Sequence, residues 1–204
     1  MTSEYGAHVR QLPARLTALD ANGRAAFAAL CAERLLPYYR WFHLTEHWGS
    51  LAALSNAIEL AWRCVVDPPV SAQEIAEARA AVEAATPDSE DFRSGLASRA
   101  LDASAAASYA LQCRGDGSVD SAVAAGEVAW EAAFGSEQTR LLRDPSVAHI
   151  AVPSDLAAAG SGSLVITEED HQDKSLTALR SVDAWSVETA HNLRRRFGSP
   201  LLDA

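Results

Sequence analysis

The chain has 204 residues, of which 49% are apolar, and it carries a formal net charge of −10 at pH 7. This length suits one domain with its own hydrophobic core, without disulfide or metal support. Sequence-independent affinity for nucleic acids comes largely from Lys and Arg side chains that neutralise phosphates, so the acidic balance argues against a nucleic acid as partner. Alanine supplies much of the apolar content, which favours helices that pack closely through small side chains.

Cysteine usage indicates a reducing environment. Cys31, Cys64 and Cys113 are odd in number and far apart, so they form neither a disulfide framework nor the paired spacing of a zinc site. The segment Met1–Arg15 lacks the apolar run of a signal peptide, and no later stretch approaches the ~20 apolar residues of a membrane span. We therefore expect a cytoplasmic protein with no membrane partner.

The first part of the chain is predicted to be an arm followed by a long helix. Residues 1–19 combine Pro13 with charges and short apolar pieces, which indicates a partly ordered arm. Asp20 or Asn22 can serve as a helix N-cap, and the following apolar residues recur at helical spacing as far as Leu36. We expect the first long helix to end there.

Pro37 divides the aromatic stretch that follows. A proline loses no hydrogen bond at the first helical position and blocks continuation of the preceding helix, so Pro37 is expected to open a short second helix that reaches Trp48. Gly49 ends that helix, and Ser50 caps a third helix with a continuous apolar stripe. The third helix is predicted to end before Asp67.

The rest of the chain continues the helical pattern. We expect further helices at about 71–86, 92–113, 118–134 and 137–143, and a last helix over 168–198. Residues 147–167 lose the helical pattern and contain Pro153, Gly160 and Gly162, which predicts a loop. The predicted fold class is all-α: a compact single-domain bundle of about six to eight mostly antiparallel helices, with a core over 20–146 on which the last helix packs.

Several residues of this helical frame follow a pattern found in a known family. The pieces are Glu33-Arg34 followed by Pro37, Tyr39 and Phe42; Trp62 near the end of the next apolar helix; Pro87 to Phe92; and Ala100 to Ala103. Their order and spacing resemble the DUF416 (YjaG-like) family of uncharacterised bacterial proteins. The resemblance spans roughly residues 20–135, with a fainter match on the last helix around Leu193-Arg194, and the segment 147–167 departs from the family pattern.

The resemblance implies an all-α cytoplasmic protein from a family for which only an association with signalling proteins such as histidine kinases is suggested. It picks out Glu33, Arg34 and Asp102 as polar residues. Arg34 falls inside an apolar helical stripe, so we favour a structural role in which an acid pairs with it and fixes helix packing. The alternative is that Arg34 recognises a carboxylate or a phosphate.

Residues 43–47 spell H-L-T-E-H, which matches the H-x-x-E-H pattern of inverted zinc proteases. On a helix, His43 and His47 would face one side, and Glu46 could activate a metal-bound water. A third ligand would have to come from a later helix, and Glu127 and Glu131 have suitable side chains. We rank this zinc-dependent hydrolase below a binding function, because the motif lies at the end of a short helix where frayed geometry holds a metal poorly.

The leading hypothesis is a non-enzymatic protein that binds another protein, as a regulator associated with signalling. Tyr38, Trp41 and Trp48 are candidates for an aromatic interaction surface. A more specific version is an immunity or antitoxin-like protein whose acidity neutralises a basic toxin. A homo-oligomer is compatible with the sequence, whereas no nucleic acid, membrane, cofactor or metal is expected.

Overall fold

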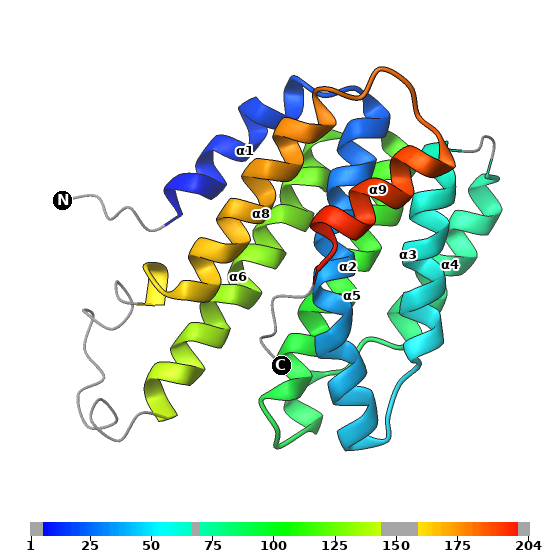
Figure 1. Ribbon diagram of the computed structural model, residues 1–204. Coiled ribbons are helices and arrows are strands. Elements are labelled where there is room, and N and C mark those ends of the chain that lie inside the picture. The colour runs from blue at the N-terminus through cyan, green and yellow to red at the C-terminus, as the bar shows by residue number, and fades with distance from the viewer. Residues whose placement is uncertain (1–5, 67–69, 144–158, 200–204) are drawn as a thin grey trace.

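A computed structural model describes residues 6–66, 70–143 and 159–199 of the chain. Positions 1–5, 67–69, 144–158 and 200–204 lie outside these ranges, and so do the corresponding parts of the predicted arm, core and loop. The described residues form eight helices and no strand, which confirms the predicted all-α single-domain bundle. In chain order the helices are α1 (Ala7–Thr17), α2 (Ala21–Glu46), α3 (Leu51–Val66), α4 (Ala72–Ala84), α5 (Leu96–Asp116), α6 (Val119–Arg143), α8 (Ser163–Leu179) and α9 (Val187–Phe197), with a 3-10 turn at Ser89–Asp91 (Figure 1).

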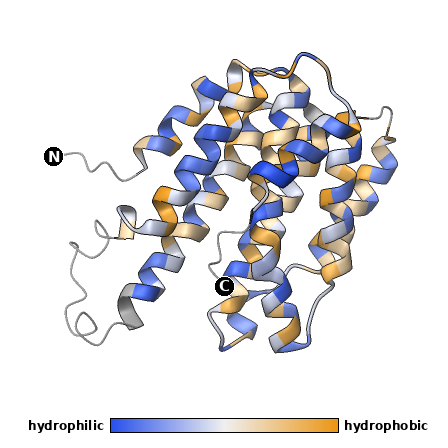
Figure 2. Ribbon diagram, in the orientation of Figure 1, coloured by the Kyte–Doolittle hydropathy of each residue, from blue (hydrophilic) through white to orange (hydrophobic). Residues whose placement is uncertain are grey.

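Helix α2 is the centre of the bundle. It packs against α3, α5, α6, α8 and α9, and its most extensive contact is with α5 (Figure 1). Both of these helices are rich in buried alanines, which let the two backbones approach closely. The outer helices are amphipathic, with hydrophilic and hydrophobic residues on different sides (Figure 2). Bulky side chains of α2 that complete the core are Phe27, Leu30, Leu35, Tyr39 and Phe42.

Pro37 lies inside α2 and does not begin a helix. The helix continues from Ala21 to Glu46, whereas the sequence predicted two helices divided at this proline. A proline in a helix interior removes one backbone hydrogen bond and costs about 3 kcal/mol. Leu35 and Tyr38, on either side of it, are buried, so the packing of one long helix outweighs the local preference.

The N-terminal segment is more regular than predicted. Residues 7–17 of the expected arm form helix α1, which packs on α6 and α8. Leu12 and Leu16, one turn apart, are completely buried, and Pro13 lies between them within the helix. Two leucines at this spacing give α1 a narrow apolar stripe, which did not stand out among the surrounding charges.

The C-terminal part contains two helices where the sequence predicted one over 168–198. The chain leaves α8 and starts α9 after Ser186, whose hydroxyl accepts a hydrogen bond from the Thr189 amide at 3.0 Å. A hydroxyl in this position satisfies a free amide of the first turn and begins a new helix. The break allows α9 to turn back across the bundle, in front of α2 in Figure 1.

The loop predicted over 147–167 is only partly within the described residues. Positions 147–158 lie outside them, and α8 already begins at Ser163, so the end of the predicted loop is helical. Upstream, the two helices predicted at 118–134 and 137–143 form the single helix α6. No helix in the described part of the chain is long and apolar enough to cross a bilayer.

Candidate functional site

Arg34 and Glu168 form an ion pair in the interior of the bundle. Arg34, on α2, is fully buried, and so is Glu168, on α8. The guanidinium donates from Nε to Oε2 of Glu168 at 2.8 Å and from Nη2 to Oε1 at 2.6 Å. Two parallel hydrogen bonds of this kind are the strongest arrangement between an arginine and a carboxylate.

Further donors of Arg34 bind other parts of the protein. Its Nη1 donates to the carbonyl oxygen of Phe197 at 3.2 Å, and its Nη2 lies 3.4 Å from the Sγ of Cys31. Phe197 is the last residue of α9, whereas Glu168 belongs to α8. One side chain of α2 therefore holds both C-terminal helices.

Gln172 extends the buried pair toward α1 and α6. Its Nε2 donates to Oε1 of Glu168 at 2.8 Å and to the carbonyl oxygen of Gly126 at 3.0 Å. Its Oε1 lies 2.9 Å from the Nε2 of His8, which is the donor. Buried polar groups need such partners, because an unsatisfied group keeps the whole cost of leaving water. The resulting network joins α1, α2, α6, α8 and α9.

Burial and charge set the protonation of this network. Desolvation lowers the pKa of Arg34, but the Glu168 carboxylate outweighs this effect, so the pKa lies above its ordinary value. Desolvation raises the pKa of the Cys31 thiol to about 12, against the opposing influence of Arg34. Cys31 is therefore a neutral thiol at physiological pH, without the thiolate character of a nucleophile.

The geometry fits the structural role proposed for Arg34. Arg34 and Glu168 have side chains that are 0% exposed, and protein atoms surround the guanidinium. Recognition of an external carboxylate or phosphate would require access from solvent, which this interior position does not provide. Removal of either partner would leave an uncompensated buried charge.

Glu33 belongs to a second and more exposed cluster beside the first. Its Oε1 accepts a hydrogen bond from Nε of Arg194 at 2.9 Å, and its Oε2 accepts one from Nε1 of Trp62 at 3.2 Å. Arg194 also donates from Nη1 to Oε2 of Glu59 at 2.9 Å, and its guanidinium lies 5.7 Å from the centre of the Trp62 ring. Hydrogen bonds to Glu59, and then to Glu33, raise the pKa of Arg194 above its usual value despite burial. The cluster fastens α9 to α2 and α3.

Asp102 lies apart from both arginine clusters. It is half-buried on α5, where the charges that act on it are Glu131 of α6 and Arg99. Burial raises the pKa of the Asp102 carboxyl to about 6, with a further rise from Glu131 and an opposing effect of Arg99. Burial and Glu131 also raise the pKa of Glu127. The fold thus places Glu33, Arg34 and Asp102 in three separate environments.

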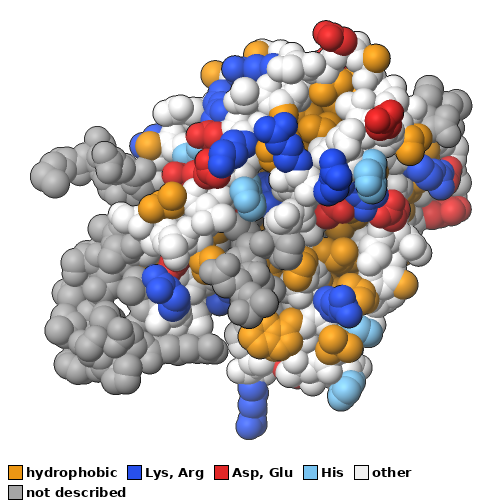
Figure 3. All heavy atoms as spheres, in the orientation of Figure 1, with side chains coloured by type: hydrophobic (Ala, Val, Ile, Leu, Met, Phe, Trp, Pro, Cys, Tyr) orange, Lys and Arg blue, Asp and Glu red, His pale blue; other side chains and the backbone are white. Residues whose placement is uncertain are grey.

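An exposed apolar surface forms where α2 ends. Trp41 is 50% exposed, Leu44 is 60% exposed and Trp48 is 37% exposed, and we name these three residues the α2-end surface. Tyr38, which the sequence had grouped with the two tryptophans, is instead part of the core. Its ring lies under the guanidinium of Arg99 at 5.5 Å, and the ring is only 1% exposed. Hydrophobic side chains gather at this lower end of the molecule in Figure 3.

Aromatic packing supports the α2-end surface from beneath. The ring of Trp48 lies 6.0 Å from that of Phe42 and 5.5 Å from that of Phe92, and the two phenylalanine rings are 4.9 Å apart. All three contacts are edge-to-face, the geometry that aromatic quadrupoles favour. The Nδ1 of His43 lies 2.9 Å from the carbonyl oxygen of Trp48, to which it donates. These contacts fix the position of Trp48.

The turn after α2 is also held in place. The hydroxyl of Tyr39 accepts a hydrogen bond from the Ser50 amide at 3.0 Å and donates one to the Ala85 carbonyl at 2.5 Å. Gly49, which directly precedes Ser50 in this turn, has a φ of 77°. A Cβ atom there would collide with the Tyr39 hydroxyl. Only glycine fits both the backbone conformation and the available space.

The H-x-x-E-H residues do not assemble the predicted metal site. The Nδ1 of His43 is engaged with a backbone carbonyl, and His47 leaves the helix with a left-handed φ of 52°. Glu46 is the last residue of α2, whereas Glu127 lies on α6. Among the described residues, no group of three or more His, Cys, Asp or Glu side chains could hold a metal ion. Within the described part of the chain, the zinc-hydrolase alternative therefore lacks its set of ligands.

Glu168 and Arg194 complete the two arginine clusters, and the sequence had not singled them out. Glu168 shares a buried face of α8 with Val165 and Leu176. A single acid within an apolar stripe is the same signal that marked Arg34, so it could have identified the partner. Arg194 is one of three consecutive arginines, and only the fainter family match at Leu193-Arg194 separates it from its neighbours.

Comparison with known proteins places the chain in a family. The family model described as "Protein of unknown function (DUF416)" matches residues 11–198. The crystal structure of a DUF416 family protein from Shewanella baltica matches with a TM-score of 0.77 and 22% sequence identity, over 91% of this chain and 92% of that chain. At this identity the structural match establishes a shared fold, and no curated protein matches the chain. As the resemblance in its sequence indicated, this protein belongs to the DUF416 family.

Proposed function

We propose that this member of the DUF416 family is a non-enzymatic protein-binding module and that the α2-end surface is its contact site. In its more specific form, the proposal is that the protein has a regulatory role associated with signalling proteins. The observation that supports it most is the joint exposure of Trp41, Leu44 and Trp48. They are half of the large hydrophobic side chains that are exposed in the described residues.

The composition of this surface is typical of a binding site. Tryptophan is enriched among the residues that dominate binding energy, and it combines a large contact area with few rotatable bonds. Isolated exposed hydrophobic residues need no explanation, but a group of them at one end of a molecule marks an interaction site. The exposed polar residues Arg40 and His47 are the sequence neighbours of Trp41 and Trp48 and would supply a polar rim.

The support beneath the surface also favours binding. Phe42 and Phe92 hold the ring of Trp48, and Tyr39 ties the following turn to Ala85. A surface that is already ordered loses little conformational entropy when a partner binds. The partner should therefore present apolar side chains to a contact site that does not rearrange.

Site-specific photo-crosslinking in cells of the source organism tests the proposal. A photoreactive residue replaces Leu44, which is 60% exposed, and a matched control places it at Ile166, an aliphatic residue of α8 that is 56% exposed. We expect one discrete adduct from position 44 and none from position 166. A second change, Trp41→Asp, should abolish the adduct, because a carboxylate in the apolar contact would be costly to desolvate.

The possible adducts have distinct meanings. An adduct from position 44 that has the same mass in every experiment would support binding through the α2-end surface, whether it contains another protein or a second copy of this chain. No adduct at position 44, or the same set of products from positions 44 and 166, would contradict the proposal. Circular dichroism of the Trp41→Asp variant verifies that the helices remain folded.

A second candidate is an immunity or antitoxin-like role in which the acidic chain binds a basic toxin. The observation that favours it is the repulsion that the Glu131 carboxylate exerts on Asp102 and on Glu127. A cationic partner would relieve this repulsion. We expect a toxin gene beside this gene, and co-expression should restore growth unless Asp102→Asn and Glu131→Gln are introduced together. A genome without an adjacent toxin gene would contradict this candidate.

A further inference from the structure

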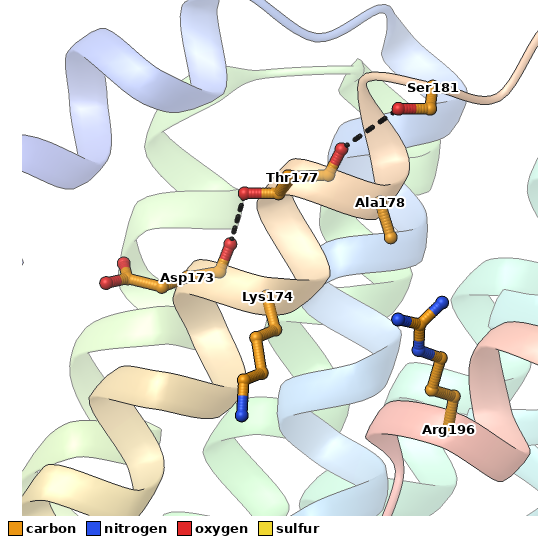
Figure 4. A pocket seen from close by; sticks show the side chains of 6 residues that line it. All are labelled: Asp173, Lys174, Thr177, Ala178, Ser181 and Arg196. Carbon is orange, nitrogen blue, oxygen red and sulfur yellow. Dashed lines mark hydrogen bonds between the residues drawn. The ribbon is translucent and has the colours of Figure 1, made fainter.

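An open groove of about 450 Å³ lies between α8 and α9. Neither arginine cluster nor the α2-end surface contributes a residue to its lining. Figure 4 shows the side chains around it, with α8 forming one wall and the last turn of α9 the other. The lining residues are Asp173, Lys174, Thr177, Ala178, Ser181 and Arg196.

The groove has an excess of positive charge. Lys174 of α8 and Arg196 of α9 line opposite walls, whereas Asp173 extends away from Arg196 in Figure 4. The carboxylate of Asp173 pairs with Arg15 and lies near His8, both on α1. Asp173 is therefore neutralised on its own side of α8. Lys174 and Arg196 thus place two cationic side chains at one groove of a chain whose net charge is −10.

Arg196 differs from the two arginines that precede it. Arg194 is held by Glu33 and Glu59, and Arg195 donates to the side-chain oxygen of Asn192 at 3.4 Å. The guanidinium of Arg196 instead lies 5.0 Å from the centre of the Phe197 ring, and no carboxylate of the described residues forms an ion pair with it. With respect to the described residues, its hydrogen-bond donors remain available to a ligand.

Lys174 can also turn toward a ligand. Its Nζ lies 2.6 Å from Oδ2 of Asp170, in a pair whose side chains are 63% and 48% exposed. Exposed pairs of this kind contribute little to stability, so an incoming anion can replace the aspartate. Ser181 offers a hydroxyl on the same wall, and its present bond to the Thr177 carbonyl is long, at 3.4 Å.

We propose that this groove binds a small phosphate monoester, with the phosphoryl group between Lys174 and Arg196. A guanidinium donates two parallel hydrogen bonds to phosphoryl oxygens, and an ammonium group adds a compact charge. Ser181 donates a further hydrogen bond. The groove is larger than a phosphate ion, so the remainder of the ester lies along Ala178. This site is separate from the α2-end surface and does not depend on the proposed function.

The sequence offers a direct readout of occupancy, because Lys174 is the only lysine in the chain. An amine-specific acylating reagent therefore modifies Lys174 and the α-amino group alone, and mass spectrometry separates the two products. We expect glycerol 3-phosphate to slow the acylation of Lys174 at least about fivefold at saturation while the α-amino group reacts at an unchanged rate. Isothermal titration with the same ester gives the dissociation constant.

Matched variants distinguish binding at a defined site from a general attraction of the ester to positive surface charge. Arg196→Gln should weaken binding of glycerol 3-phosphate about tenfold or more and abolish the protection of Lys174. Arg195→Gln removes the same charge from the adjacent position, and it should change the dissociation constant by less than about twofold. Equal losses in the two variants, or no protection of Lys174 in the wild-type protein, would overturn the proposal.

Two further probes identify the ligand chemistry. Sulfate resembles the phosphoryl group in shape, and protection by sulfate equal to that by glycerol 3-phosphate would show that the groove does not select a phosphate monoester. Vesicles of phosphatidic acid in phosphatidylcholine present the same group on a lipid surface. Co-sedimentation with these vesicles without protection by the soluble ester would assign the groove to a lipid headgroup and overturn the proposal.

Discussion

Glu33 and Arg34 are adjacent in the sequence, yet they hold the C-terminal helices through two very different clusters. The side chains of Arg34 and its partner Glu168 are both 0% exposed. In the second cluster, the side chains are 27% exposed for Arg194, 18% for Glu33 and 59% for Glu59. Both clusters connect α2 to the end of the chain, but only one of them is removed from water.

The difference in exposure predicts a difference in energetics. Two charges in the interior lose their hydration, and their attraction offsets that loss only while both are present. Charges at the surface stay hydrated, so their attraction is weak and is screened by salt. The buried pair should therefore be sensitive to the loss of one partner, whereas the exposed cluster should be sensitive to salt and pH.

The largest expected effect comes from breaking the buried pair. Arg34→Met leaves Glu168 charged and unpaired in the core, which should lower the free energy of unfolding by about 3–5 kcal/mol. Adding Glu168→Leu removes the stranded charge and should recover most of this loss. Urea denaturation of the two single variants and the double variant measures the effect. A double variant as unstable as Arg34→Met would show that the hydrogen bonds of the network, and not the unpaired charge, dominate.

Loss of the Asp102 carboxylate, which lies outside the two clusters, should raise the free energy of unfolding instead of lowering it. The pKa of Asp102 rises from 3.8 to about 6, so its ionisation destabilises the fold. This rise corresponds to about 3 kcal/mol, and we expect Asp102→Asn to stabilise the protein by about 2 kcal/mol near pH 7.5 after allowance for solvent screening. Below about pH 3 the carboxyl is neutral in both the folded and the unfolded state, so the gain should disappear there.

Denaturation midpoints at the two pH values measure the Asp102 effect. In a Glu131→Gln background the gain should be smaller, because one cause of the raised pKa has been removed. A gain that is independent of pH would contradict the electrostatic explanation.

The exposed cluster should respond moderately to the loss of its arginine. Arg194→Met keeps an apolar stem against Trp62 and loses the charged contacts, which should lower the free energy of unfolding by about 1–2 kcal/mol at low salt. In about 0.5 M sodium chloride this loss should fall by about half, whereas that of Arg34→Met should be nearly unchanged. If salt changed the stability loss of Arg194→Met and of Arg34→Met by the same amount, the proposed difference between the exposed cluster and the buried pair would be wrong.

The smallest expected effect belongs to Glu59, the most exposed member of the cluster. Its hydrogen bond from Arg194 lowers the pKa of the carboxyl, against the effect of burial, so its ionised form stabilises the fold. Glu59→Gln should cost about 0.5 kcal/mol at pH 7, and the cost should vanish as the pH falls through the lowered pKa. Thermal unfolding at pH 7 and pH 3 measures the change. In an Arg194→Met background Glu59→Gln should have no effect.

The sequence predicted the general design of the first cluster but not its members. A charge at position 34 within an apolar stripe indicated that an acid must pair with it. The structure supplies Glu168, which is 134 residues further along the chain. The apolar stripe of α8 marks Glu168 as a candidate partner, but only the packing of the helices decides that it approaches Arg34. The same limit applies to Arg194, because its contacts with Glu33 and Glu59 are set only when α9 is placed.

Tertiary packing also overrode local preferences along the chain. Pro37 is tolerated inside α2 because the residues around it are buried, and Leu12 and Leu16 convert a predicted arm into helix α1. On α2, Tyr38 and Trp41 are both aromatic and one turn apart. Only the position of α5 and α6 decides that Tyr38 is buried and Trp41 is half exposed.

The sequence by itself determined the fold class, the family and the need for a partner at Arg34, because helical periodicity, composition and motif spacing are local properties of the chain. The tertiary structure alone decided that Glu168 is that partner and that Trp41, Leu44 and Trp48 share one exposed end. It also brought Lys174 and Arg196 to opposite walls of one groove. Each of these outcomes depends on contacts between distant segments, whose free energies are fixed only when the helices pack together.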